Sequence, residues 1–201
     1  MKRVTIAVCL LVLTAGCIVQ TGDSNSTTAT PSLADRVDRN AKTPAEPTTP
    51  SAVTYEVDVE RIEDAFHRKI NQQRISQGTE PLKRSEKLDR IARYKSWDMA
   101  HRDYVAHSGP NGTTHSMMRQ KFNSSCTKYG QNIHFRKNFG DPESAKPHLD
   151  NVSGATSLAV KSLMNSSGHR QNILDPDYEV QGIGVFVDEN GTLYLTQEFC
   201  G

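Results

Sequence analysis

The chain has 201 residues, enough for one domain of ordinary size with appendages. Its 24 basic and 23 acidic side chains nearly cancel, so nothing in the charge indicates nucleic acid as a partner. Hydrophobic residues make up 35% of the chain and are unevenly spread, which indicates polar segments beside a folded part.

The N-terminus has the features of an export signal. A basic start, Met1–Arg3, precedes an apolar run over 4–14 that is too short to span a membrane comfortably. The run ends in Leu-Thr-Ala-Gly-Cys, which resembles the lipobox of prokaryotic lipoproteins, where the cysteine carries lipid. We therefore expect a signal peptide over 1–16 and a lipid on Cys17 that holds the protein on the extracellular face of the cell membrane. The alternative is an ordinary signal peptide and a secreted product.

Residues 17–53 are rich in Ser, Thr, Pro and Ala and have almost no large apolar side chain. Such a segment buries too little surface to offset the entropy lost on ordering, so we expect a disordered linker. Glycosylation sequons occur in it and downstream, and they are compatible with a glycosylated exterior. They begin at Asn25, Asn111, Asn123, Asn151, Asn165 and Asn190.

The cysteines agree with export. Cys9 leaves with the signal peptide and Cys17 would carry lipid, which leaves Cys126 and Cys200. In an oxidising compartment, and without a Cys-x-x-Cys spacing, we expect these two to form a disulfide; free thiols or a metal pair are the alternatives. The bond would close a loop of about 75 residues and stabilise the fold by on the order of 4 kcal/mol in the chain-entropy model.

The expected domain, residues 54–201, begins with two segments of helical periodicity. The first predicts a helix over 57–77 that ends at Gly78, and the second predicts a helix over 85–103 with Ser85 as its N-cap. The side chains expected to face the core are Ile62, Phe66, Ile70, Ile75, Leu88, Ile91, Ala92, Ser96 and Met99.

Further along, the pattern mixes strands and helix. We expect a strand over 129–135, a surface loop over 137–154, a helix over 155–164, and two strands within 182–200. The last two flank Asn-Gly, the strongest short signal for a hairpin. Helices early and late, with strands between them and at the end, imply a layered α+β domain.

Four stretches occur in a recognisable order: "SWDMAHRDYVAHSGPNG" at 96–112, "YGQNI" at 129–133, "LMNSSGHRQNILDPDYEVQGIGV" at 163–185 and "YLTQEFC" at 194–200. Together they resemble the CAP domain (SCP; cysteine-rich secretory protein, antigen 5, pathogenesis-related 1) in its prokaryotic form. The Gly-His-Arg-x-Asn-Ile-Leu stretch is the most specific of them. The resemblance implies a three-layer α-β-α sandwich with a small antiparallel sheet.

That family carries two histidines and two acidic residues in a surface cleft. His107, in Val-Ala-His-Ser, and His169, in Ser-Gly-His-Arg, lie where its histidines lie. Gln131 stands where the family usually has Glu, and residues 163–166 have neither the second acid nor the usual Trp. The resemblance therefore predicts a cleft lined by the two histidines and Gln131, with Asn165 at its rim.

Two neutral imidazoles in one cleft could hold a divalent metal such as zinc, with Gln131 adding an oxygen. A strong zinc site also needs a third good ligand, which the sequence does not display, so no cofactor is expected with certainty. Ser108, Ser166 and Ser167 neighbour the histidines, but none lies in a Gly-x-Ser-x-Gly elbow. No complete catalytic set is identified.

The resemblance implies binding more often than catalysis, with a lipid, a sterol, a glycan or another small ligand as the partner. One alternative is a secreted hydrolase, metal- or His-assisted, acting on surface polymer or peptide. Another is a structural envelope protein in which the Gly-His-Arg stretch serves only the fold. Trp97 and Tyr104 are expected in the core or the cleft wall. The histidines expected at the surface without a role are His67, His115, His134 and His148.

Overall fold

The computed structural model describes residues 58–137, 139 and 152–201. The expected signal peptide, Cys17, the linker and His148 lie outside the described residues. The described chain forms helices α1 (Val59–Ser76), α2 (Glu86–His101), α3 (His115–Lys121), α4 (Val152–Asn165) and α5 (Ser167–Leu174) and strands β1 (Lys83–Arg84), β2 (Tyr129–Arg136), β3 (Val180–Val187) and β4 (Leu193–Cys200). None of these helices is long and apolar enough to cross a membrane.

The first two helices begin and end where local signals predict. The Asp58 carboxylate accepts the Arg61 amide at the start of α1, and Gly78 follows its end with a φ of 76°. Ser85 caps α2 through the Leu88 amide, as expected.

The expected inward-facing side chains of these two helices are buried, with one exception. Ile75 is 61% exposed, so that prediction is wrong. Five residues separate it from Ile70, which places it about 140° further round the helix, away from the core.

The sheet has the order β1-β3-β4-β2. β3 and β4 form the predicted hairpin, and β2 is the predicted strand before α4. β4 lies between β2 and β3 and pairs antiparallel with each of them. The two-residue strand β1 pairs parallel with β3, so the small sheet is mixed. In the β2–β4 register, Gln131 lies directly opposite Glu198.

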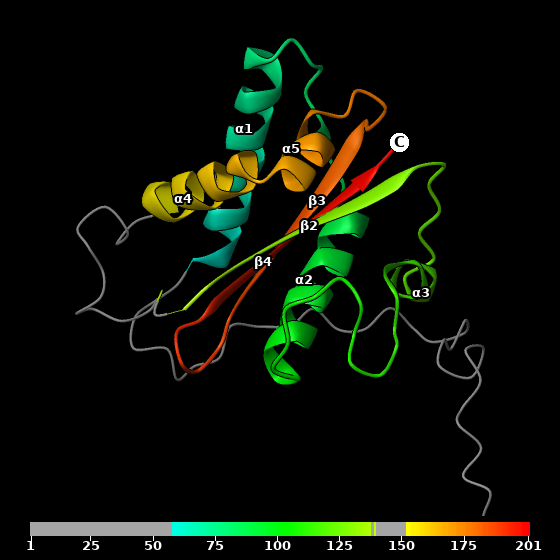
Figure 1. Ribbon diagram of the computed structural model, residues 1–201, viewed down its shortest axis with the longest axis vertical. Coiled ribbons are helices and arrows are strands. Elements are labelled where there is room, and N and C mark those ends of the chain that lie inside the picture. The colour runs from blue at the N-terminus through cyan, green and yellow to red at the C-terminus, as the bar shows by residue number, and fades with distance from the viewer. Residues whose placement is uncertain (1–57, 138, 140–151) are drawn as a thin grey trace, which may run out of the picture. The chain divides into compact units, whose positions relative to one another are not determined.

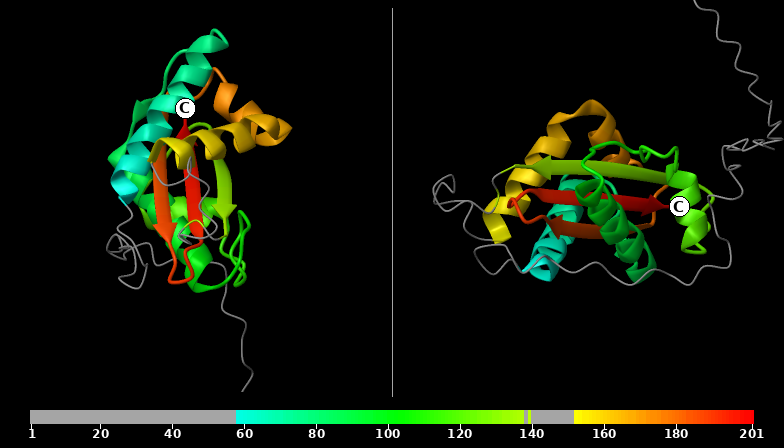
Figure 2. Two further views of the ribbon diagram at one scale, coloured as in Figure 1. Left: turned by 90° about the vertical axis from the view of Figure 1, so that its left-hand side faces the viewer. Right: turned by 90° about the horizontal axis from the view of Figure 1, so that it is seen from below.

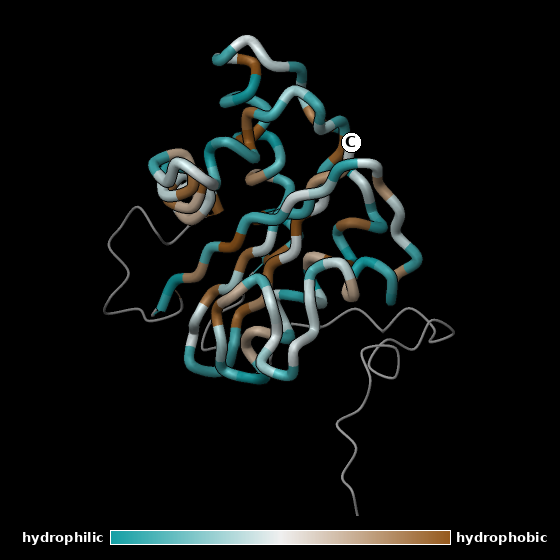
Figure 3. The backbone as a smooth tube through the Cα atoms, turned by 45° about the vertical axis from the view of Figure 1, so that its right-hand side comes forward, coloured by the Kyte–Doolittle hydropathy of each residue, from teal (hydrophilic) through white to brown (hydrophobic). Residues whose placement is uncertain are grey.

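Helices cover both faces of the sheet, which confirms the three-layer α-β-α sandwich (Figures 1 and 2). α1, α4 and α5 pack on one face over the largest apolar cluster, which includes Phe66, Leu163, Ile183 and Leu195. α2 lies across β3 and β4 on the other face, with α3 beside it. Figure 3 shows the apolar residues gathered along the strands, while the connecting turns are hydrophilic.

α2 approaches β3 so closely that only glycine fits between them. A Cβ at Gly184 would lie 1.9 Å from the backbone nitrogen of Arg93, and one at Gly182 would lie 2.2 Å from the backbone carbon of Leu88. The Gly-x-Gly of β3 is therefore the contact surface for α2.

Beyond β1, the outer edge of β3 is capped by two carboxylates. Asp89 of α2 accepts the Ile183 amide at 2.7 Å, and Glu63 of α1 accepts the Val185 amide at 2.9 Å. Arg93 forms an ion pair with Glu63. These side chains satisfy edge amides that would otherwise be buried without partners, and they bind both helices to the strand.

Three elements were not predicted: β1, α3 and α5. α3 and α5 have seven and eight residues, too short for periodicity to reveal, although Thr114 caps α3 through the Met117 amide. α4 begins at Val152, so the end of the expected 137–154 loop is helical; residues 140–151 lie outside the described residues.

Candidate functional site

A hydrogen-bonded chain runs from the surface into the sheet at the edge strand β2. His107 is exposed in the loop between α2 and α3, and its Nδ1 lies 2.8 Å from Oε1 of Gln131. The buried Gln131 amide donates to Oε1 of Glu198 at 2.7 Å. Glu198, on the neighbouring strand, is fully buried.

The hydrogen bonds from His107 through Gln131 to Glu198 determine which nitrogen of His107 carries the proton when the ring is neutral. A carboxylate can only accept, so the NH₂ group of Gln131 must face Glu198 and its carbonyl must face His107. His107 therefore donates from Nδ1, which leaves the lone pair on Nε2. An exposed imidazole thus presents a hydrogen-bond acceptor.

Glu198 also binds two groups of α3. Its Oε2 lies 2.6 Å from Nε2 of His115 and 3.2 Å from Nη1 of Arg119. The expectation that His115 is a surface residue without a role is therefore wrong, because its ring is half-buried against this carboxylate. The sequence signal for Glu198 is that it is the one acidic residue of the last expected strand, LYLTQEFC.

Glu198 gives a physical reason for the glutamine at position 131. With glutamate there, two carboxylates would meet across the β2–β4 pair in a buried place, which is strongly unfavourable. Glutamine instead donates to Glu198 and accepts from His107. An acidic group is thus present next to the site, on β4 rather than β2.

His169 lies on α5, close enough to His107 for the two rings to affect each other electrostatically. Burial and the neighbouring His107 lower the pKa of His169. Burial, helped by Arg136 and His169, lowers the pKa of His134 to about 4. His134 was expected at the surface without a role; it is instead half-buried on β2 and electrostatically coupled to His169.

The rest of the Gly-His-Arg stretch serves the fold. Asn132 of β2 donates to the backbone oxygen of His169 at 3.1 Å and accepts from Asn172 at 2.9 Å. Ile173 is fully buried in the core. The Asn172 and Ile173 side chains of the stretch therefore dock α5 on β2 and the core.

From Asn132, hydrogen bonds between buried side-chain amides cross the sheet and reach another histidine. Asn132 donates to Gln197, which donates to Gln181, and the Gln181 amide lies 2.8 Å from Nδ1 of His67. His67 is half-buried, so the expectation that it lacks a role is also wrong. Its role is structural, joining α1 to the sheet.

Lys95 of α2 supports the loop that carries His107. It is 2% exposed and donates to the His107 backbone oxygen at 3.1 Å and to the Tyr104 hydroxyl at 2.9 Å. Burial lowers the pKa of Lys95 to about 8. Tyr104 thus helps to support this loop, whereas Trp97 lines a separate cavity of about 310 Å³ between α2 and α3.

Asn165, expected at the rim of the histidine cleft, lies at the exposed C-terminal end of α4. There it lines a cavity of about 300 Å³ between α1 and α4. Its place beside the histidines stays a prediction.

The donor set does not fit a strong zinc site. Within residues 58–137, 139 and 152–201, no three His, Cys, Asp or Glu side chains are grouped so that they could hold a metal ion. Gln131 is occupied on both sides by His107 and Glu198. Two imidazoles without a third ligand make a weak site for a divalent ion.

Acid should weaken the fold through His134. Its pKa is lower in the folded state, so between pH 6.5 and about 4 the unfolded chain binds more protons, and stability falls as the pH falls. We expect the wild type to lose up to about 3 kcal/mol more than His134→Gln between pH 7 and pH 4. Urea unfolding of both proteins at several pH values measures this difference, and parallel stability curves would contradict the prediction.

A mixed sheet between two helical layers is the α-β-α sandwich that the sequence resembles. A model of the cysteine-rich secretory protein family, CAP, matches residues 67–199. The uncharacterized protein YkwD of Bacillus subtilis is 31% identical over 179 residues, which are 89% of this chain and 58% of that protein. The chain therefore belongs to the CAP family, and it spans less than two thirds of the length of this relative.

Solved structures show the same fold. An extracellular protein of Bacillus anthracis that contains an SCP domain aligns with a TM-score of 0.59 and 21% identity, over 77% of this chain and 44% of that one. An outer surface protein of Borrelia burgdorferi aligns with a TM-score of 0.58 and 13% identity, over 72% of this chain and 96% of that one.

The predicted disulfide is present. Cys126 and Cys200 are bonded, with 5.5 Å between their Cα atoms. The bond joins the segment after α3 to the end of β4, two residues beyond Glu198.

Proposed function

We propose that this protein is a cell-surface CAP protein that binds a small ligand, such as a lipid or a glycan, at His107 and His169. The observation that carries the proposal is the series of hydrogen bonds that runs from the buried Glu198 through Gln131 to His107. A purely structural histidine has both nitrogens satisfied within the fold. Here a buried carboxylate and amide orient an exposed ring so that its Nε2 lone pair is available to a ligand.

The geometry favours binding over hydrolysis. Among the described residues, no hydrogen bond joins Ser108, Ser166 or Ser167 to an imidazole, so no serine nucleophile is paired with a base. Glu198 reaches His107 only through Gln131, and its other oxygen binds His115 and Arg119. This arrangement orients a histidine and lacks the activated nucleophile of a covalent hydrolase.

The proposed place of action is the outer face of the membrane, with Cys17 as the lipid anchor. The lipobox-like sequence supports the anchor, and similarity to proteins described as extracellular or outer surface proteins supports the location. Cys17→Ser should move the protein from the membrane fraction to the medium, and continued retention in the membrane would contradict the anchor.

Native mass spectrometry tests the ligand site. The full-length protein, purified from the membrane fraction of its natural cells, should carry a ligand that adds mass. His107→Ala/His169→Ala should lose that mass, because it removes the Nε2 acceptor and its neighbour. His101→Ala, an exposed histidine of α2, should keep it.

Two results would reject the site. One is a bare polypeptide mass for the wild type, which would favour a structural role for both histidines. The other is a ligand that survives in the double variant with the same occupancy, which would place it elsewhere on the protein.

A further inference from the structure

A groove with an excess of positive charge runs between α1 and α4, on the helical layer that also holds α5. Two cavities of about 380 and 300 Å³ form it, and they adjoin because Lys69 and Gln72 line both. The first begins at Arg61, and the second ends at Gln73. At the rise of an α-helix, this stretch of α1 is about 18 Å long.

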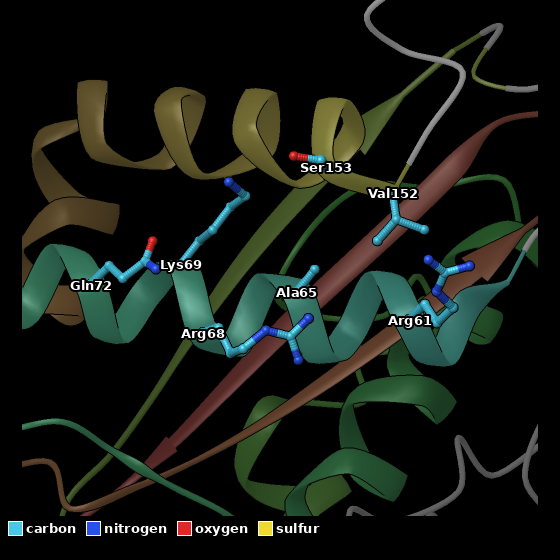
Figure 4. A pocket seen from close by; sticks show the side chains of 7 residues that line it. All are labelled: Arg61, Ala65, Arg68, Lys69, Gln72, Val152 and Ser153. Atoms are coloured by element: carbon cyan, nitrogen blue, oxygen red, sulfur yellow. The ribbon is translucent and has the colours of Figure 1, made fainter.

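The groove is lined along its whole length by cations. Arg61, Arg68 and Lys69 come from α1, at the i, i+7 and i+8 positions that share one helix face, and Lys161 comes from α4. Figure 4 shows the Lys69 side chain extending toward α4 and Arg61 lying near Val152 at the start of that helix.

No carboxylate lines either cavity among the residues that the structure describes. α4 has no acidic residue at all, and Lys161 is its only charged residue. Arg61 is close to Asp58, at 3.8 Å, whereas Arg68, Lys69 and Lys161 have no acidic partner within the described chain. The Glu63 carboxylate of α1 does not line the groove, because it accepts a hydrogen bond from the Val185 amide of β3.

None of these cations is buried in the core of the fold. The side chains are partly or fully exposed, and cations held close together repel one another, so they are unfavourable until an anion joins them. Between the cations, the walls carry amides and hydroxyls that suit sugar hydroxyls, together with a few apolar side chains. The polar ones are Gln72, Gln73, Ser153, Ser157 and Asn165, and the apolar ones are Ala65, Val152, Val160 and Met164.

We propose that the α1–α4 groove binds an extended acidic glycan, separately from the histidine site. Its length suits a chain of several sugars, its cations suit carboxylates or other anionic substituents, and its amides suit hydroxyls. A recessed groove between two helices suits a single chain better than a flat anionic membrane. The ligand would neutralise Arg68, Lys69 and Lys161 together.

Binding of oligogalacturonate to the full-length protein in detergent tests this proposal, with neutral dextran of equal length as the comparison. At low salt the protein should bind the acidic chain and not the neutral one, and added NaCl should weaken binding. Arg68→Glu/Lys69→Glu should raise the Kd at least about tenfold, because two cations become anions at contact distance. Arg68→Gln/Lys69→Gln should raise it less.

The matched control is Lys83→Glu/Lys87→Glu, which makes the same change in net charge at two exposed lysines outside the groove. It should change the Kd less than about twofold, and thermal melting should show that all variants fold. His107→Ala/His169→Ala should bind the acidic chain as the wild type does, which separates this proposal from the histidine site.

Three outcomes would overturn the proposal. The groove variants could bind as tightly as the wild type, or the control could weaken binding as much as they do. The wild type could also bind phosphatidylglycerol vesicles while ignoring the acidic glycan, which would make the groove a membrane contact.

Discussion

Gly184→Ala adds a single methyl group and should nevertheless lower the stability of this protein strongly. The added Cβ would lie 1.9 Å from the Arg93 nitrogen and 2.2 Å from the Ala92 carbonyl carbon, and both are backbone atoms of α2. A flexible side chain could rotate away, but a helix backbone cannot. α2 must therefore move off β3, at a cost of about 3 kcal/mol or more.

A melting temperature lowered by roughly 6–12 °C is the expected readout for a domain of this size. Gly168→Ala is the matched control, because a Cβ there meets nothing within 4 Å and the residue lies within α5. That change should leave stability equal or slightly higher, since alanine favours helix over glycine by about 1 kcal/mol. Similar melting temperatures for the two variants would contradict the described contact between α2 and β3.

Loss of the Cys126–Cys200 disulfide should have a comparable effect. The bond closes a segment with a sequence separation of 74 residues, and the chain-entropy model assigns such a loop about 4 kcal/mol. Cys126→Ser should therefore lower the melting temperature by roughly 8–16 °C.

The two single variants and the double variant separate the bond from other effects of substitution. Cys200→Ser and Cys126→Ser/Cys200→Ser should lose as much stability as Cys126→Ser, because each removes the same bond. Reductant should destabilise the wild type and leave all three variants unchanged. A wild-type melting temperature that does not respond to reductant would contradict the prediction.

The disulfide also bears on the candidate site. It joins the segment that follows Arg119 to β4 close to Glu198, so it helps to hold α3 against the buried carboxylate.

Much of the fold could be predicted from the sequence because its signals are local. Ser85 caps α2, Gly78 follows α1, and Asn190-Gly191 lies in the turn between β3 and β4, each acting within a few residues of itself. The disulfide followed from the elimination of the other cysteines. The two histidines and Gln131 came from a family resemblance, since no spacing by itself brings them together.

The groups that surround His107 could be seen only in the tertiary structure. His115 and Glu198 are 83 residues apart, and the β2–β4 register places Glu198 opposite Gln131. A shift of one residue would turn Glu198 to the other face of the sheet, and local sequence carries no record of that choice. The sequence alone determined the end of α1, the start of α2, the hairpin, the cysteine pair and the family. Strand register and helix packing decided which charged groups are buried together. These groups come from segments that are far apart in the sequence, so local sequence patterns do not show that they meet in the fold.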